Sequence, residues 1–176
     1  MNIEVEIRSF ISKEEYDRLL VFFREEGELV KDDYQVTYYF DCEEDLRIQR
    51  NNFYSKIWFK KGKIHDEHRE EIEIKFDRDE FEKLERLFLS LGYGIEIKWL
   101  RKRFKFSWEG IVVCVDDTKG YGRIIELEQV CSDEEKEDVL KGLKEKLARL
   151  GVSLTPKEVF ERRFLAYKKN WRELIE

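Results

Sequence analysis

The chain has little of what usually divides a protein into domains or cross-links it. It has one proline, Pro156, and no stretch rich in glycine and serine among its 176 residues. We therefore expect a single domain over residues 1–176, without an internal linker. The three cysteines are odd in number and lack the spacing of zinc ligands, which excludes a complete disulfide framework and a cysteine zinc site. This usage predicts a reducing, cytoplasmic location.

Long apolar runs are also absent. No run approaches the roughly 20 residues of a membrane-spanning helix, and the first residues, MNIEVEIRSF, carry charges where a signal peptide has its apolar core. The formal net charge is −6, with acidic and basic residues interspersed. A net negative chain binds nucleic acid poorly. We therefore expect no membrane partner and no general nucleic-acid binding.

The sequence is rich in helix and strand patterns. Four segments have apolar residues at three- and four-residue spacing, and each begins with a capping signal: Ser12 with Glu15, Asp77 with Glu80, Ser132 with Glu135, and Thr155 with Glu158. Alternation of apolar and polar residues predicts strands near residues 3–9, 34–41, 46–51, 54–61, 69–76, 95–107, 111–117 and 122–129. Hairpin-linked strands predominate, so we predict an α+β fold with a mostly antiparallel sheet. Eight such strands can close into a barrel, with the helices flanking it.

Acidic residues repeat along one face of several predicted strands. Glu4 and Glu6 share a face in the first strand, as do Glu126 and Glu128 in the last. Acids spaced in this way lie about 7 Å apart and repel by roughly 2 kcal/mol at an effective dielectric near 20. Divalent cations would cancel this repulsion, because Mg²⁺ and Mn²⁺ prefer oxygen ligands. An antiparallel sheet with one solvated face alternates similarly, so the pattern alone leaves both interpretations open.

Basic residues gather on other strands, at Arg47, Lys56, Lys60, Lys61, Arg101 and Arg103. If the sheet closes, an acidic wall and a basic wall surround one lumen. Arginine and lysine bind phosphate through charge-assisted hydrogen bonds, and carboxylates bind it through divalent cations. The arrangement therefore predicts a small triphosphate-containing substrate, with phosphoryl chemistry driven by positioning and charge stabilisation.

The segment Glu4-Val5-Glu6-Ile7-Arg8 resembles the ExExK signature of the CYTH superfamily, the triphosphate tunnel metalloenzymes, with arginine in the last place. Other motifs resemble the family's motifs in the same order: Tyr39-Phe40-Asp41, Leu46-Arg47-Ile48, Trp58-Phe59-Lys60-Lys61-Gly62, Arg69 with Glu71 and Glu73, Arg101-Lys102-Arg103, and Asp116 with Gly120, Gly122, Glu126 and Glu128. The resemblance covers residues 3–128 and implies a closed eight-stranded barrel.

The resemblance also implies roles for single residues. The implied metal ligands, for Mg²⁺ or Mn²⁺, are Glu4, Glu6, Asp116, Glu126 and Glu128, with Glu71 and Glu73 as additional acids. The implied triphosphate-binding residues are Arg8, Arg47, Lys61, Arg69, Arg101 and Arg103. The family hydrolyses tripolyphosphate or nucleoside and thiamine triphosphates, or converts ATP to cyclic AMP and pyrophosphate. We expect a metal-dependent triphosphatase, since no base-recognition pocket is identifiable in the sequence. An adenylate cyclase of class IV type is the first alternative, and a non-catalytic polyphosphate or nucleotide binder is the second.

Several positions depart from the family pattern. Thr37 stands where an acid is common, and Gln49 stands where a second arginine is common. Tyr121, Arg123 and Ile124 replace the usual leucine, acid and phenylalanine, and Arg163-Phe164 is the nearest match to a C-terminal Ser-Tyr pair. These departures bear on substrate choice more than on the fold. The preferred substrate, the metal and the oligomeric state, with a homodimer as one option, stay open.

Overall fold

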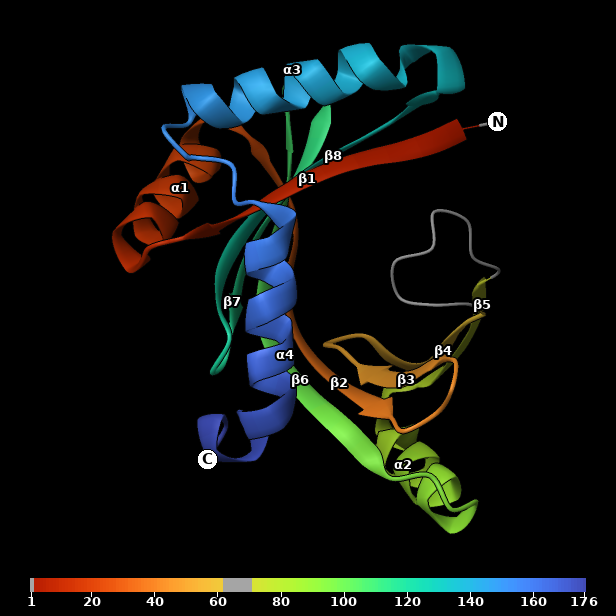
Figure 1. The fold of residues 1–176 in the computed structure, drawn as a ribbon. Coiled ribbons are helices and arrows are strands. Elements are labelled where there is room, and N and C mark those ends of the chain that lie inside the picture. Colours follow the sequence, from red (N-terminus) through yellow and green to blue (C-terminus); the bar gives the residue numbers. More distant parts are fainter. Residues whose placement is uncertain (1, 62–70) are drawn as a thin grey trace. The chain divides into compact units, whose positions relative to one another are not determined.

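The structure is a computed structural model that describes residues 2–61 and 71–176, without the side chains of Asn2 and Glu71 (Figure 1). The strands are β1 (Asn2–Ile11), β2 (Glu28–Phe40), β3 (Asp45–Arg50), β4 (Tyr54–Lys60), β5 (Glu71–Asp77), β6 (Ile95–Trp108), β7 (Ile111–Thr118) and β8 (Gly122–Ser132). The helices are α1 (Lys13–Glu26), α2 (Phe81–Ser90), α3 (Lys136–Arg149) and α4 (Lys157–Leu174). Short 3-10 turns, Arg78–Glu80 and Asp133–Glu135, precede α2 and α3.

The strands form one eight-stranded sheet in the order β1-β8-β7-β6-β2-β3-β4-β5. The pairs β1–β8, β7–β8, β2–β3, β3–β4 and β4–β5 are antiparallel. The predicted α+β fold, with eight mostly antiparallel strands and flanking helices, is confirmed. Within the described residues β1 and β5 are the two ends of the order, so backbone hydrogen bonds do not close this sheet into a barrel.

The chain divides into two compact units. Unit 1 comprises residues 1–32 and 102–166, and unit 2 comprises residues 33–101 and 167–176. Strands β2 and β6 and helix α4 each contribute residues to both units. No helix in the described part of the chain combines the length and the apolar character that a membrane span requires.

The core of unit 1 lies between the sheet and the helices α1 and α3, which contact β1, β7 and β8 (Figure 1). Ile7 pairs with Leu127 across β1–β8, and Val113 pairs with Leu127 across β7–β8. All three are buried in one cluster with residues of α1 and α3. Since side chains alternate along a strand, the even-numbered residues of these strands point to the opposite face.

Unit 2 has its own core, in which Phe81 and Leu84 of α2 pack with Phe40 and Ile48 of the sheet. The C-terminal half of α4 is fixed to β6 by two side chains. Tyr167 donates its hydroxyl hydrogen to the carbonyl of Lys98, at 2.7 Å. Trp171 donates its indole N–H to the carbonyl of Glu96, also at 2.7 Å.

The helix-start predictions have different outcomes. The capping boxes of Ser12 with Glu15 and of Ser132 with Glu135 are present. The prediction for Asp77 is wrong, because its side chain makes no capping hydrogen bond and a 3-10 turn separates it from α2. The Thr155 hydroxyl accepts a hydrogen bond from the backbone N–H of Phe10, at 2.9 Å. The start of α4 is therefore tied to β1 by this bond.

Candidate functional site

Three glutamates of unit 1 converge on the polar face of the sheet. Glu6 of β1 lies directly opposite Glu128 of β8, and Glu4 lies two residues along β1. One carboxylate oxygen from each of the three lies within 4.8 Å of the others. Glu4 and Glu6 are exposed and Glu128 is half-buried. We call this group the acidic trio; it offers only oxygen ligands, which suit hard divalent cations.

The pKa values of two members of the trio show that ionising all three carboxyl groups is unfavourable. Partial desolvation raises the pKa of Glu6, although its side chain still contacts solvent, and the charge of Glu126 raises it further. Desolvation and the charges of Glu126 and Glu4 likewise raise the pKa of Glu128. Like charges close together disfavour ionisation. A cation bound to the trio would relieve this repulsion.

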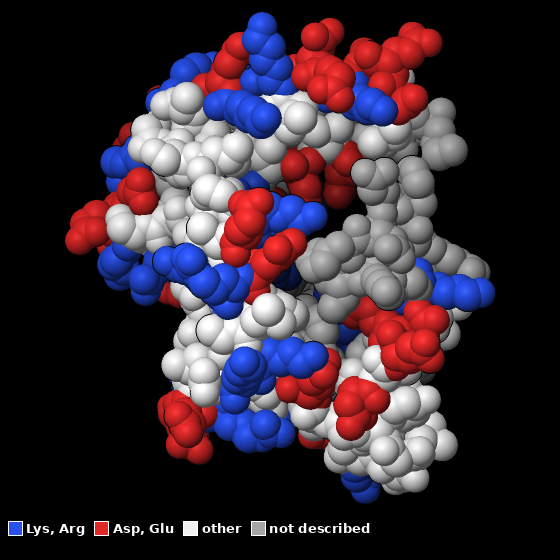
Figure 2. Space-filling model, viewed as in Figure 1, with Lys and Arg blue, Asp and Glu red and all other residues white. Residues whose placement is uncertain are grey.

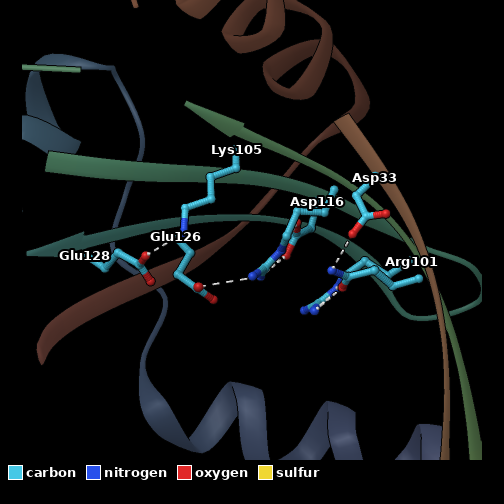
Figure 3. A network of polar contacts seen from close by, with 8 residues as sticks. Asp33, Arg101, Lys105, Asp116, Glu126 and Glu128 are labelled. Carbon is cyan, nitrogen blue, oxygen red and sulfur yellow. Dashed lines mark hydrogen bonds and ion pairs between the residues drawn. The ribbon is translucent and has the colours of Figure 1, made fainter. Parts of the chain in front are cut away.

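The other two predicted acids of unit 1 are engaged with Arg103 of β6 (Figure 3). The Arg103 guanidinium donates from Nε to Oδ1 of Asp116 at 2.8 Å and from Nη2 to Oδ2 at 2.7 Å. Its Nη2 also lies 3.5 Å from Oε1 of Glu126. Burial acts to lower the pKa of Arg103, but the charge and hydrogen bonds of Asp116, with the charge of Glu126, raise it above its usual range. Arg103 is therefore a fixed, permanently charged cation.

Lys105, two residues further along β6, lies beside the acidic trio. Its Nζ is 3.7 Å from Oε1 of Glu128. Sequence reasoning omitted this lysine from the candidate site, although it follows Arg101 and Arg103 at the same two-residue spacing. Arg103 and Lys105 of β6 thus both contact predicted acids of unit 1.

Apart from Arg8 of β1, which is exposed and lies in unit 1, the remaining predicted residues that can be described lie in unit 2. Arg47 forms two hydrogen bonds with Asp45, at 2.6 and 2.5 Å, and its guanidinium lies 4.3 Å from the ring centroid of Tyr39. Arg101 donates to Oε1 of Gln35 from Nε at 2.9 Å and from Nη2 at 2.5 Å. Gln35 in turn donates to Asp33, at 3.1 Å (Figure 3). These two arginines are oriented by neutral or acidic neighbours of their own unit.

Trp58 is surrounded by cations. The side-chain charges of Arg47, Lys56 and Lys60 lie 5.0, 4.3 and 4.2 Å from the centroids of its ring. Lys60 and Trp58 share a face of β4, whereas Lys61 lies beyond the end of this strand and is exposed. Lys61 stays a predicted phosphate ligand, and Lys60 joins the candidates. The signal in the sequence was that Lys60 lies two residues after Trp58 and four after Lys56, which places all three on one face of a strand.

The additional acids have separate outcomes. Glu73 accepts a hydrogen bond from Lys56 at 2.8 Å and lies 3.6 Å from Lys75. The bond from Lys56 is the main reason that the pKa of Glu73 is lowered. The backbone of Glu71 belongs to β5, but its side chain lies outside the described residues, as does Arg69. Their predicted roles stay predictions.

A family model described as the CYTH domain matches residues 2–164 of this chain. The chain belongs to the CYTH domain family. A Methanocaldococcus jannaschii protein named as a putative adenylate cyclase is 31% identical over 164 residues, which cover 86% of this chain and 91% of that protein.

Solved structures agree with this membership. A conserved hypothetical protein from Pyrococcus furiosus has a TM-score of 0.67 and 26% identity, with 86% of this chain and 92% of that chain covered. A Hippeastrum protein, described as a putative adenylyl cyclase with a dominant triphosphatase activity, has a TM-score of 0.64 and 20% identity. That match covers 92% of this chain and 95% of the Hippeastrum chain, and it shows the shared fold.

Two of the departures from the CYTH pattern, at Thr37 and Gln49, are bonded to each other. Thr37 and Gln49 lie directly opposite each other across β2–β3, and Gln49 donates its side-chain N–H to the Thr37 hydroxyl at 3.0 Å. Both are buried. This chain therefore has a neutral hydrogen-bonded pair where the family commonly has an acid and an arginine.

The departure at Arg123 lies away from the acidic trio. Arg123 faces Asp117 across β7–β8, with Nε 3.1 Å from Oδ2, and its guanidinium lies 5.7 Å from the ring centroid of Tyr16 in α1. It is on the helix-facing side of the sheet. Arg123 therefore lies on the opposite face of the sheet from the acidic trio. Outside the sheet, Figure 2 shows acidic and basic side chains interspersed over the visible side of α3.

Proposed function

We propose that the protein is a divalent-metal-dependent hydrolase that cleaves inorganic tripolyphosphate or a nucleoside or thiamine triphosphate. The observation that carries this proposal is the acidic trio with Lys105 and Arg103 on the same face of unit 1. Carboxylates and cations together suit a ligand that is itself anionic and bound to metal. In this proposal the described groups bind phosphate and metal, and phosphoryl transfer is catalysed almost entirely by such positioning and charge stabilisation.

The donor set fits Mg²⁺ or Mn²⁺. Glu4, Glu6 and Glu128 supply oxygen atoms close enough to share one ion. Burial and, after it, the charges of neighbouring glutamates raise the pKa values of Glu6 and Glu128, and an ion would offset the repulsion between these charges. When bound, the ion would supply Lewis-acid stabilisation of the phosphate oxygens. Asp116 and Glu126 stay predicted ligands.

In the proposed reaction, Lys105 and Arg8 donate hydrogen bonds to the phosphate oxygens, and Arg103 provides a positive charge that Asp116 holds in place. Water attacks the terminal phosphorus, the bridging P–O bond breaks, and the diphosphate oxygen leaves. The products are orthophosphate and diphosphate, or the corresponding diphosphate ester, and the proton of the water passes to solvent. In unit 2, Arg47, Lys61 and Arg101 stay predicted phosphate ligands, with Lys60 added on its position beside Trp58.

Adenylate cyclisation is the second candidate, and the name of the Methanocaldococcus jannaschii relative, 31% identical, favours it. In that reaction the ribose 3′-hydroxyl attacks the α-phosphorus and pyrophosphate leaves. The same acidic trio and cations would serve this reaction. Cyclisation additionally requires contacts to the base and the ribose, and this requirement separates the two reactions experimentally.

The test is a substrate panel with purified protein and either Mg²⁺ or Mn²⁺: tripolyphosphate, ATP, other nucleoside triphosphates and thiamine triphosphate. Release of orthophosphate supports hydrolysis, and cyclic AMP with pyrophosphate supports cyclisation. Metal-dependent binding without turnover identifies a non-catalytic binder. Glu4→Gln with Glu6→Gln should abolish turnover, whereas Glu25→Gln with Glu26→Gln, which removes two exposed charges from α1, should not. Full activity in the first double variant would reject the metal assignment.

A further inference from the structure

Two arginines and two phenylalanines form a stack in unit 1, where the start of α4 meets the end of β1. The Arg8 guanidinium lies 4.8 Å from the ring centroid of Phe160. The rings of Phe160 and Phe10 are stacked, with centroids 4.4 Å apart and an interplanar angle of 24°. Arg163 lies 4.1 Å from the centroid of Phe10. The order is therefore Arg8, Phe160, Phe10, Arg163.

The position of Phe160 is set by the segment before α4. The Ser9 hydroxyl donates to the carbonyl of Ser153 at 2.9 Å and accepts from the N–H of Thr155 at 2.8 Å. The N–H of Phe10 donates to the Thr155 hydroxyl at 2.9 Å. Ser9 is fully buried. These bonds fix the beginning of α4 against β1, and Phe160 follows within the helix.

Arg8 belongs to this stack and also lies on the strand face that carries the acidic trio. It lies two residues after Glu6 on the same face of β1 and directly opposite Glu126 of β8, and its side chain is exposed. The planar guanidinium can stack on an aromatic face, whereas a lysine ammonium is a flexible point charge. Stacking uses the face of the guanidinium, so the N–H groups at its edges can still donate to phosphate.

We propose that Phe160 is a positioning residue, which holds the Arg8 guanidinium in the orientation that binds a substrate phosphate. This rests on the proposed function, because it assigns Arg8 to the phosphates of the same substrate. The stack restricts the Arg8 side chain before the substrate arrives, so less conformational freedom is lost on binding.

The kinetic test compares Phe160→Leu, which removes the ring and keeps an apolar side chain, with Phe160→Tyr, which keeps the ring. Phe160→Leu should raise KM for the triphosphate substrate about two- to fivefold, the range of one solvent-exposed cation–π contact, with little change in kcat. Phe160→Tyr should stay near wild type. Phe22→Leu, which removes a ring packed on Trp108 away from the stack, is the matched control. Equal increases in KM for Phe160→Leu and Phe22→Leu would overturn the proposal.

A second comparison isolates Arg8. In an Arg8→Lys background, Phe160→Leu should have much less effect on KM than in wild type, because the planar partner is gone. An undiminished effect would contradict the positioning role. Ring-current shifts of the Arg8 side-chain protons, measured by NMR without ligand, should disappear in Phe160→Leu and persist in Phe160→Tyr.

The NMR readout separates failure of this inference from failure of the proposed function. If the shifts are present but no triphosphate is turned over, the hydrolase proposal fails, and calorimetric titration with tripolyphosphate then decides the role of Phe160. Weaker tripolyphosphate binding in Phe160→Leu than in Phe22→Leu supports the inference. Equal binding, or none to the wild-type protein, overturns it.

Discussion

Replacing Asp116 with asparagine should destabilise the protein strongly. The Asp116 side chain is 2% exposed and the Arg103 side chain 19% exposed, and the two share both hydrogen bonds of the bidentate pair. Removing one partner of a buried pair leaves an uncompensated charge and costs about 3–5 kcal/mol. In Asp116→Asn, the Arg103 guanidinium still lies 3.5 Å from Glu126. We therefore expect a loss of stability at the lower end of this range, about 3 kcal/mol. For a chain of this size that lowers Tm by about 6–12 °C.

The assay is thermal unfolding followed by circular dichroism, in chelator, so that no bound metal contributes. Glu6→Gln is the matched control, since it removes a charge that its neighbours repel. Its Tm should stay the same or rise. Arg103→Met combined with Asp116→Leu should recover much of the stability lost in Asp116→Asn, because both charges are gone. If Asp116→Asn unfolds within 1 °C of the wild type, the pair is not structural and the reasoning fails.

Three further predictions concern charge. The raised pKa of Glu6 means that the folded state binds its proton more tightly than the unfolded state does, so ionisation of Glu6 lowers the free energy of unfolding as pH rises above 4.5. In Glu6→Gln, the free energy of unfolding by urea, measured with a chelator present, should therefore change less with pH in this range. The pKa of Glu109 is lowered to about 2, chiefly by its hydrogen bond from Arg149, so the loss of Tm in Glu109→Gln should be largest at neutral pH and shrink as pH falls from 4.5 toward 2. Lys60→Ala should raise KM for the triphosphate substrate more than Lys61→Ala, and the reverse order would contradict the face assignment of Lys60.

The sheet was predictable because its side chains alternate with a period of two. Ile7 and Leu127 are buried against the helices, whereas Glu6 and Glu128 stand on the opposite face and pair directly across β1–β8. This alternation fixes the face of every residue once one strand is oriented. The start of the helix after Asp77 was not predicted correctly. The residues that follow Asp77 form a 3-10 turn before the helix begins, and a capping signal in the sequence does not specify the type of the first turn.

The division of the acids between two roles was not predictable from the sequence. Glu4, Glu6 and Glu128 form one group, while Asp116 forms an ion pair with Arg103. Which acid meets an arginine depends on the relative position of residues on neighbouring strands, and one sequence carries little information on that register. The two-residue spacing placed Lys105 on the face of Arg103, but its contact with Glu128 was not predictable for the same reason, since Glu128 lies on another strand, β8.

The pair Thr37 and Gln49 shows how a departure from a family pattern is interpreted in the fold. Considered alone, Gln49 suggests weaker binding of phosphate, because an arginine is missing. In the structure its amide is bonded to Thr37, and the two side chains are 5% and 3% exposed. An arginine alone at 49 would be a buried charge without the acid that the family commonly has at 37, which is costly. The joint change leaves the local charge balance as it was, so the proposed phosphate binding in unit 2 is better judged from Arg47, Lys56 and Lys60, whose charges lie around Trp58.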